Sequence, residues 1–124
     1  MSKTILAVDD SASVRQLVRM TLTGAGYQVI EAGDGREALT KAQSSGGPIH
    51  GVVTDVNMPH MNGIELVAEL RKLPSFDGVP ILCLTTESDE GMKQQARSAG
   101  ASGWLIKPFR PEQLVSVVNR ITGA

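Results

Sequence analysis

The stretch Gly51-Val52-Val53-Thr54-Asp55-Val56-Asn57-Met58-Pro59 is the best starting point for understanding this chain. Its apolar, β-branched start predicts a strand that is buried on both faces, as in a parallel sheet. Pro59 has no N–H group and cannot continue a central strand, so the chain must leave the sheet shortly after Asp55. A carboxylate thus stands at the carboxyl end of a buried strand, where open parallel sheets bind ligands. A single Asp at such a place can equally be a solvated loop residue, and this stretch alone leaves both interpretations open.

Short apolar runs alternate with helix-type patterns along the whole chain. We expect strands at residues 5–8, 27–30, 52–55, 80–84 and 104–106, and a helix after each of them, the fourth at 87–99. Residues 74–78 have the composition of a loop. The buried stripe of the first helix is expected to comprise Val14, Leu17, Val18, Leu22 and Ala25. Five strands alternating with five helices predict one α/β domain with a parallel sheet covered on both faces, a doubly wound (βα)5 arrangement.

Local start signals agree with this pattern. Ser11 or Ser13 can cap the first helix. Asn62 and Glu65 have the spacing of a capping box ahead of the third helix, and Pro111 suits the first position of the fifth helix.

Composition limits the classes of function. The 124 residues carry a formal net charge of −1, which argues against a strongly basic surface for nucleic acid. The single cysteine, Cys83, cannot form an internal disulfide or a zinc site. No signal peptide and no apolar run of about 20 residues is present, so we expect no membrane association. We expect a cytoplasmic, monomeric protein whose residues 1–124 form one domain with no attached output domain.

Polar side chains stand at the carboxyl ends of four of the expected strands. They are Asp9 and Asp10 after the first strand, Asp55 after the third, Thr85 after the fourth and Lys107 after the fifth. The strand order 2-1-3-4-5 would bring all of them to one edge of the sheet. Taken singly, each has an ordinary alternative as a helix cap, a strand-end residue or a solvated charge, but their shared position favours a common site.

Three neighbouring carboxylates repel one another. Two unit charges about 4 Å apart repel by roughly 4 kcal/mol at an effective dielectric constant near 20. Mg²⁺ accepts carboxylate and carbonyl oxygens, and Lys107 can neutralise a further charge. A carboxylate held beside Mg²⁺ and an ammonium group is suited to in-line phosphoryl transfer, to which the Thr85 hydroxyl can add a hydrogen bond.

Four motifs resemble those of a known family. They are Ala7-Val8-Asp9-Asp10-Ser11, Thr54-Asp55-Val56-Asn57-Met58-Pro59-His60-Met61-Asn62-Gly63, Leu84-Thr85-Thr86-Glu87 and Leu105-Ile106-Lys107-Pro108-Phe109. Over essentially its whole length the chain resembles the receiver domain of two-component response regulators, in particular the stand-alone chemotaxis (CheY-like) type. The resemblance implies a flavodoxin-like fold and a phosphoacceptor protein rather than an enzyme acting on other substrates.

The resemblance also implies roles for the pocket residues. Asp55 matches the phosphoacceptor, whose phosphoryl donor is a phosphohistidine on a sensor histidine kinase. Asp10, Asp55 and the backbone carbonyl of Asn57 match the Mg²⁺ ligands, with Asp9 acting mainly through water. Thr85 and Lys107 match the hydroxyl and ammonium groups that contact the phosphoryl group, and the Lys107–Pro108 bond is expected to be cis. Asn57 and Glu87 match variable positions beside the acyl phosphate.

The output side of the family includes the fourth helix, the fifth strand and the fifth helix. Here the resemblance places the partner-binding candidates Met92, Gln95, Ser102, Trp104, Phe109, Arg110 and Gln113. The expected partner is a flagellar motor component or another signalling protein. Trp104 departs from the Tyr or Phe common at its position. Because the indole ring is larger, we expect Trp104 still to respond to Thr85, but with a smaller or partial inward shift.

Other functions fit the residues less well. A Mg²⁺-dependent phosphatase with Asp55 as nucleophile would more typically carry an Asp-x-Asp pair after the first strand. Flavin binding on the same fold is disfavoured by an aromatic content of 3% and by the lack of a Ser/Thr-Gly-rich phosphate loop. A phosphorelay intermediate or a phosphate sink remains an alternative within the receiver family.

Overall fold

The computed structural model describes residues 3–86 and 90–123. Five parallel strands form one sheet in the order β2-β1-β3-β4-β5. They are β1 (Thr4–Val8), β2 (Gln28–Ala32), β3 (Gly51–Asp55), β4 (Ile81–Thr85) and β5 (Gly103–Ile106). The α/β fold and the 2-1-3-4-5 order predicted from the sequence are thereby confirmed.

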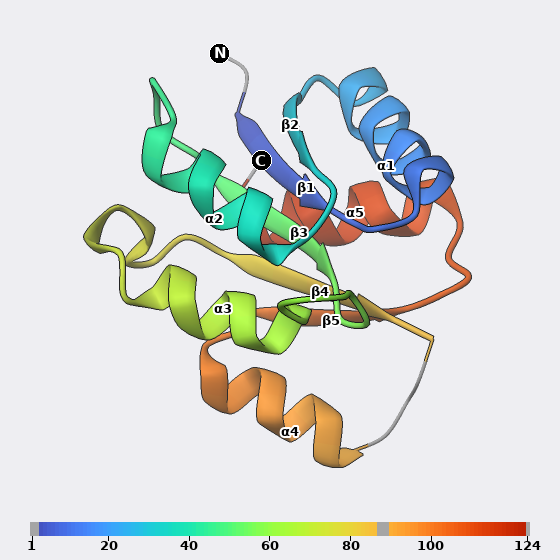
Figure 1. The fold of residues 1–124 in the computed structure, drawn as a ribbon. Helices are drawn as coiled ribbons and strands as arrows, with labels where there is room; N and C mark the ends of the chain where they lie inside the picture. The colour runs from blue at the N-terminus through green and yellow to red at the C-terminus, as the bar shows by residue number, and fades with distance from the viewer. Residues whose placement is uncertain (1–2, 87–89, 124) are drawn as a thin grey trace.

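Helices cover both faces of this sheet (Figure 1). They are α1 (Ala12–Gly24), α2 (Gly35–Ser44), α3 (Gly63–Arg71), α4 (Glu90–Ala99) and α5 (Pro111–Thr122), with a 3-10 turn η1 at Pro74–Phe76. One hydrophobic cluster lies between the sheet and α2, α3 and α4, and includes Val52, Leu66 and Leu70. A second cluster lies between the sheet and α1 and α5, and includes Val18 and Leu114. The central strands β3 and β4 are fully buried, which explains their unbroken apolar sequences.

Helix starts follow the expected side-chain chemistry. Ser11 is the N-cap of α1 and accepts a hydrogen bond from the Val14 N–H group. Asn62 and Glu65 form a complete capping box at the start of α3, as predicted. Pro111 opens α5, where its missing N–H group costs no hydrogen bond.

Several details differ from the prediction. Leu17 is 44% exposed and Ala25 is also exposed, so Val18 and Leu22 are the buried members of the predicted stripe of α1. The expected loop at 74–78 contains η1, which is anchored by buried Phe76. The predicted helix start at Glu87 lies outside the described residues. The error in the stripe of α1 arises because a helical pattern does not reveal how wide a face its tertiary partners cover.

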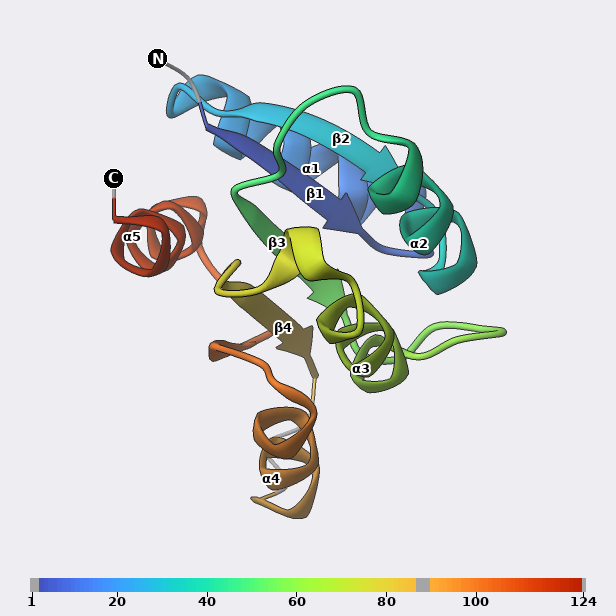
Figure 2. The ribbon, with the colours of Figure 1, turned by 90° about the vertical axis from the view of Figure 1, so that its left-hand side faces the viewer.

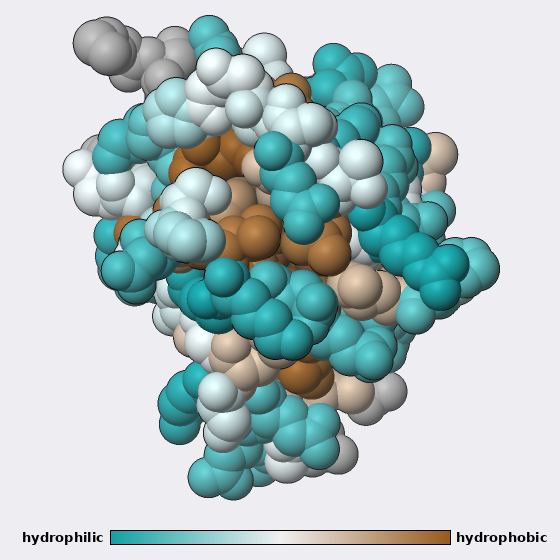
Figure 3. Space-filling view, turned by 60° about the vertical axis from the view of Figure 1, so that its left-hand side comes forward, coloured by the Kyte–Doolittle hydropathy of each residue, from teal (hydrophilic) through white to brown (hydrophobic). Residues whose placement is uncertain are grey.

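A shallow hollow lies on the side of the sheet that α2 and α3 cover. It measures about 290 Å³ and lies between the end of α2, the segment before β3, and η1; Ala42, Ile49 and Phe76 are among its lining residues. Figure 3, turned toward this side, shows apolar side chains framed by hydrophilic ones. Among the described residues, no helix combines the length and the apolar character needed to cross a membrane.

Candidate functional site

The parallel register brings the predicted acidic residues to the carboxyl edge of the sheet. Asp9 directly follows β1, and Asp55 is the last residue of β3. One carboxylate oxygen from each of Asp9, Asp10 and Asp55 lies within 4.8 Å of the others. Asp9 and Asp55 are buried, whereas Asp10 is exposed. The three carboxylates therefore form one acidic pocket that is open to solvent at Asp10.

Lys107 lies between the two buried carboxylates of this pocket. Its Nζ is 3.1 Å from Asp9 Oδ2 and 3.2 Å from Asp55 Oδ1, and its side chain is only 16% exposed. The backbone N–H group of Lys107 donates to the Thr85 carbonyl at 2.6 Å, which fixes the residue beside the end of β4. The Lys107–Pro108 peptide bond is cis, as the resemblance led us to expect.

Burial and neighbouring charges both act on the Asp55 carboxyl group. Burial, followed by repulsion from Asp9, raises the pKa of the Asp55 carboxyl group, and Lys107 opposes this rise. One ammonium group faces a cluster of three carboxylates, so a charge excess remains. A cation bound between these carboxylates would offset that excess.

The donor set fits Mg²⁺. This ion prefers hard oxygen ligands, binds through one or two carboxylates and keeps several waters. Asp10 is accessible from solvent, and Asp55 is close enough to share an ion with it. Asn57 is exposed in the loop after β3, where its backbone carbonyl follows Asp55 by two residues.

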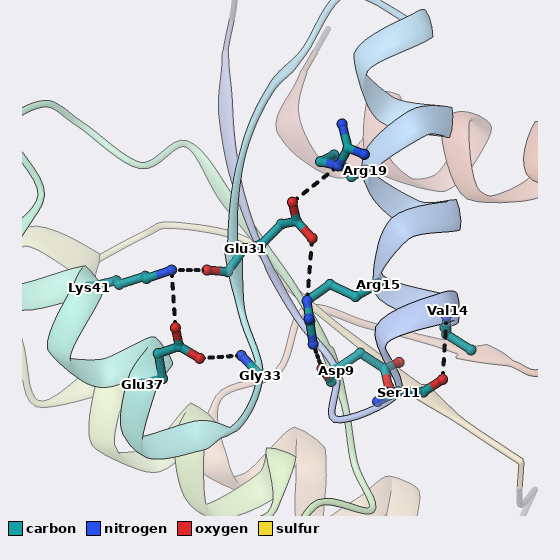
Figure 4. Close-up of polar contacts among 9 residues, drawn as sticks. All are labelled: Asp9, Ser11, Val14, Arg15, Arg19, Glu31, Gly33, Glu37 and Lys41. Atoms are coloured by element: carbon teal, nitrogen blue, oxygen red, sulfur yellow. Dashed lines mark hydrogen bonds and ion pairs between the residues drawn. The ribbon is translucent and has the colours of Figure 1, made fainter.

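Asp9 is held from four directions. Its N–H group donates to the end of β2 at 3.2 Å, and its Oδ1 accepts from the Ser11 N–H group at 2.9 Å. Its Oδ2 faces Lys107, and its backbone carbonyl accepts from Arg15 Nη1 at 2.7 Å. Figure 4 shows Arg15 reaching back from α1 toward Asp9. The sequence pattern did not indicate this contact, because it depends on how α1 packs beside the loop.

Gly63 packs closely against the backbone of Asp55. A Cβ atom at Gly63 would lie 2.2 Å from the Asp55 carbonyl oxygen and 2.9 Å from Val56 Cα. The Gly63 N–H group also donates to the Val56 carbonyl at 2.9 Å. The first residue of α3 is thus packed directly against the end of β3, and only glycine fits there.

Comparison with known proteins now identifies the family. Residues 5–119 match the model of the response regulator receiver domain. The chain belongs to the response regulator receiver domain family. The chain is similar to chemotaxis protein CheY1 of Helicobacter pylori, with 36% identity and 96% of each chain covered. It is also similar to chemotaxis protein CheY of Thermotoga maritima, with 35% identity covering 98% of this chain and 99% of the relative.

Solved structures place this receiver domain in the same fold group. Chemotaxis protein CheY4 of Vibrio cholerae shares 47% identity and superposes with a TM-score of 0.93, covering 98% of this chain and 99% of that one. A receiver domain of a sensor histidine kinase from Pseudomonas aeruginosa PAO1 shares 26% identity with a TM-score of 0.89 and complete coverage of both chains. That structure is described as having a magnesium ion coordinated in the active site cleft. Receiver domains of the CheY type act in chemotaxis signalling, and phosphorylation-dependent signalling is general to the family.

Thr85 and Trp104 lie on neighbouring strands of this receiver domain. Thr85 is buried at the end of β4 and pairs in register with Ile106, two residues beyond Trp104 on β5. Trp104 is partly buried against the cluster under α2, α3 and α4. Its indole Nε1 is buried and has no hydrogen-bond partner among the described residues. A hollow of about 140 Å³ adjoins it, lined by Lys93, Ala96, Arg97, Ala101, Ser102, Gly103 and Trp104.

Apart from Trp104, the predicted partner-binding residues of the receiver domain fall into two groups. Gln95, Ser102, Arg110 and Gln113 are exposed. Met92 packs partly against the cluster under α4, and Phe109 partly against the cluster under α5. The polar members are thus available to a partner, while Met92 and Phe109 also contribute to the core.

Proposed function

We propose that this receiver domain accepts a phosphoryl group on Asp55 from the phosphohistidine of a sensor histidine kinase, in a Mg²⁺-dependent reaction. The observation that supports this most directly is the placement of Asp55 3.2 Å from Lys107 inside a cluster of three carboxylates. We place this reaction in the cytoplasm. Phosphorylation would change the affinity of the domain for a protein target in chemotaxis or motility. The names of its chemotaxis relatives support this choice of pathway.

The chain's own residues account for the chemistry. An Asp55 oxygen attacks the phosphorus atom, an O–P bond forms, and the P–N bond breaks with its electron pair passing to the imidazole nitrogen. Lys107, freed from part of its pairing with Asp55, stabilises the negative oxygens of the transferred group. The Thr85 hydroxyl donates a further hydrogen bond to one of these oxygens. Attack by water on the same phosphorus atom later releases inorganic phosphate and restores Asp55.

The proposed metal ligands are Asp10, Asp55 and the carbonyl of Asn57, with Asp9 contributing mainly through water. When bound, Mg²⁺ neutralises charge on the carboxylates and on the phosphoryl oxygens. The magnesium ion described in the Pseudomonas aeruginosa receiver domain supports this assignment. The protein then acts on its own side chain, as a signalling protein rather than as an enzyme with a separate substrate.

The proposed output passes through Thr85 and Trp104. Movement of Thr85 toward the phosphoryl group would open space behind it on the face that it shares with Trp104. The partner surface would comprise Met92, Gln95, Trp104, Phe109, Arg110 and Gln113. The target is a flagellar motor component or another signalling protein; the alternative is a phosphorelay intermediate or a phosphate sink. Pull-down with phosphorylated and unphosphorylated protein distinguishes a target-binding regulator from a sink.

Phosphorylation itself can be tested with a small-molecule donor. Protein incubated with phosphoramidate and Mg²⁺ should gain one phosphoryl group on Asp55, as mapped by mass spectrometry. The Asp55→Asn variant and wild-type protein in EDTA should remain unlabelled. Asp77→Asn, a change at the exposed aspartate that follows the η1 turn, is the matched control and should label normally. Strong labelling of Asp55→Asn protein, or equal labelling in EDTA, would refute the proposal.

The coupling of Thr85 to Trp104 has its own test. Beryllofluoride with Mg²⁺ mimics the aspartyl phosphate, and Trp104 is the only tryptophan of the chain. We expect its emission to change on titration in the parent protein and to stay nearly constant in Thr85→Ala, because an element responds only through its different interactions in the two states. Fluorine NMR checks that Asp55 is occupied in both. An equal change in both proteins would show that Thr85 is not the link.

A further inference from the structure

Arg15 connects the acidic pocket to the neighbouring strand β2. Its Nη1 donates to the Asp9 carbonyl at 2.7 Å, while its Nε lies 3.3 Å from Glu31 Oε1 (Figure 4). The side chain is 23% exposed, so it is largely packed between the two segments. A planar guanidinium group can hold two acceptors at fixed relative positions in this way, which an ammonium group cannot.

Glu31 is itself held in place. Its Oε2 lies 3.1 Å from Arg19 Nε, and its backbone carbonyl accepts a hydrogen bond from Lys41 Nζ. Lys41 also pairs with Glu37 at 3.2 Å, and Glu37 Oε1 accepts from the Gly33 N–H group at 2.6 Å. Figure 4 shows these contacts as one continuous network that runs from α1 across β2 to α2. Arg15 thus rests on a carboxylate that is fixed from several sides.

Stability alone is a weak explanation for this arrangement. Partly exposed ion pairs of this kind contribute only about 0–1 kcal/mol each to stability. The contact with the Asp9 carbonyl has a more specific consequence, because that oxygen belongs to the peptide group that joins Asp9 to Asp10. The peptide group is planar, so a hydrogen bond that holds this oxygen also fixes the plane of the group. It thereby fixes the orientation of Asp10, the residue that follows.

We propose that Arg15 is a positioning residue that sets the orientation of Asp10 for Mg²⁺ through the Asp9–Asp10 peptide, with Glu31 as its anchor. This inference rests on the proposed function, since it takes Asp10 as a metal ligand. Groups that orient metal ligands without touching the metal typically change metal affinity by about 10–100-fold when they are removed.

Charge and positioning make opposite predictions, which allows a clear test. Removing a cation close to the carboxylates makes the pocket more negative, so electrostatics alone would tighten Mg²⁺ binding. Loss of the orienting hydrogen bond would weaken it instead. A hollow of about 220 Å³ adjoins Arg15, Glu31 and Gly33, so water can occupy the space that a shorter side chain at position 15 would leave. The direction of the change therefore identifies the role.

The experiment is a Mg²⁺ titration followed by the amide chemical shifts of ¹⁵N-labelled protein. Arg15→Gln removes both the positive charge and the planar guanidinium group. Arg15→Lys keeps the charge but cannot bind the Asp9 carbonyl and the Glu31 carboxylate at the same time. We expect both variants to bind Mg²⁺ about tenfold more weakly than the parent. Arg19→Gln is the matched control, because it removes a cation that pairs with the same Glu31 and leaves the contact between Arg15 and Asp9 intact. The Mg²⁺ affinity of this variant should stay within about twofold of the parent value.

The phosphorylation rate supplies a second readout. At saturating Mg²⁺, Arg15→Lys should approach the parent rate with phosphoramidate, because the variant alters the binding of the metal and leaves Asp55, Thr85 and Lys107 in place. If circular dichroism shows that an Arg15 variant has lost its fold, Glu31→Gln takes its place in the experiment. This variant removes the charged anchor of Arg15 and should also weaken Mg²⁺ binding.

Two results would overturn the inference. They are unchanged or tighter Mg²⁺ binding in folded Arg15→Lys and Arg15→Gln proteins, or an equal loss of affinity in Arg19→Gln. Failure of the proposed function itself would look different, because the parent protein would then neither bind Mg²⁺ in the pocket nor become phosphorylated.

Discussion

At the scale of single residues, Gly63 shows how little space surrounds the end of β3. A Cβ at this position would lie 2.2 Å from the Asp55 carbonyl oxygen, a backbone atom that cannot rotate away. We predict that Gly63→Ala lowers the free energy of unfolding by about 1–3 kcal/mol, the usual range for overpacking, and slows labelling of Asp55 by phosphoramidate. Urea unfolding and mass spectrometry measure the two effects. Gly24→Ala is the control: a Cβ there meets nothing within 4 Å, and stability should be unchanged or slightly higher.

Cys83 illustrates a second effect of burial on one residue. It lies within β4 with no exposed surface, and burial raises the pKa of its thiol to about 12. Because the thiolate is the reactive form, we predict that native protein at pH 8 does not react with Ellman's reagent, whereas urea-unfolded protein reacts stoichiometrically. Rapid reaction of the folded protein would contradict the buried position.

At the scale of elements, the start of α2 depends on a carboxylate that also holds the preceding loop. The hydrogen bond from the Gly33 N–H group, followed by Lys41, lowers the pKa of Glu37. A carboxylate with a lowered pKa in the folded state stabilises the protein above its unfolded pKa, and this stabilisation is lost as the pH falls through the folded pKa. Glu37 is 47% exposed, so solvent screening limits the effect to a fraction of a kcal/mol, about 0.5 at most.

The corresponding variant is Glu37→Gln. We predict a small loss of stability at pH 7 that disappears at a pH below the lowered folded pKa, where Glu37 is neutral in the parent as well. Urea unfolding of both proteins at the two pH values measures it. A difference that persists or grows in acid would show that the side chain acts through packing.

At the scale of the whole molecule, the acidic pocket opposes folding when no metal is present. Asp10 adds a third carboxylate to a pair that shares one lysine. We predict that Asp10→Asn raises the melting temperature in EDTA by roughly 2–6 °C, the shift expected for about 1 kcal/mol in a domain of this size. The rise in melting temperature on adding Mg²⁺ should be smaller than in the parent. Thermal melts with and without Mg²⁺ test this, with Asp77→Asn as the control; a lower melting temperature of Asp10→Asn in EDTA would contradict it.

Much of the fold and of the pocket could be predicted from the sequence, because both depend on local patterns. The apolar run before Asp55 predicts a central strand, and strand-end chemistry then predicts that Asp9 and Lys107 meet Asp55. The exposure of Leu17 could not be predicted in the same way, since it depends on how much of α1 is covered. The Arg15–Asp9 contact was also missed, because its geometry is set by the packing of α1 against β2.

The two ends of the described chain lie together, away from the pocket. Lys3, which precedes β1, donates through Nζ to the carbonyl of Thr122, the last residue of α5. Figure 2 shows the start of β1 and the end of α5 on the side of the sheet opposite the strand arrowheads, where the acidic residues lie. A linker of about five residues, up to about 17 Å long, could therefore join them. New ends could be opened at the exposed Gly46-Gly47 loop, which precedes β3 at the same edge. Such a circular permutant should keep Mg²⁺-dependent labelling of Asp55 and would place a fused reporter far from every group that takes part in phosphoryl transfer.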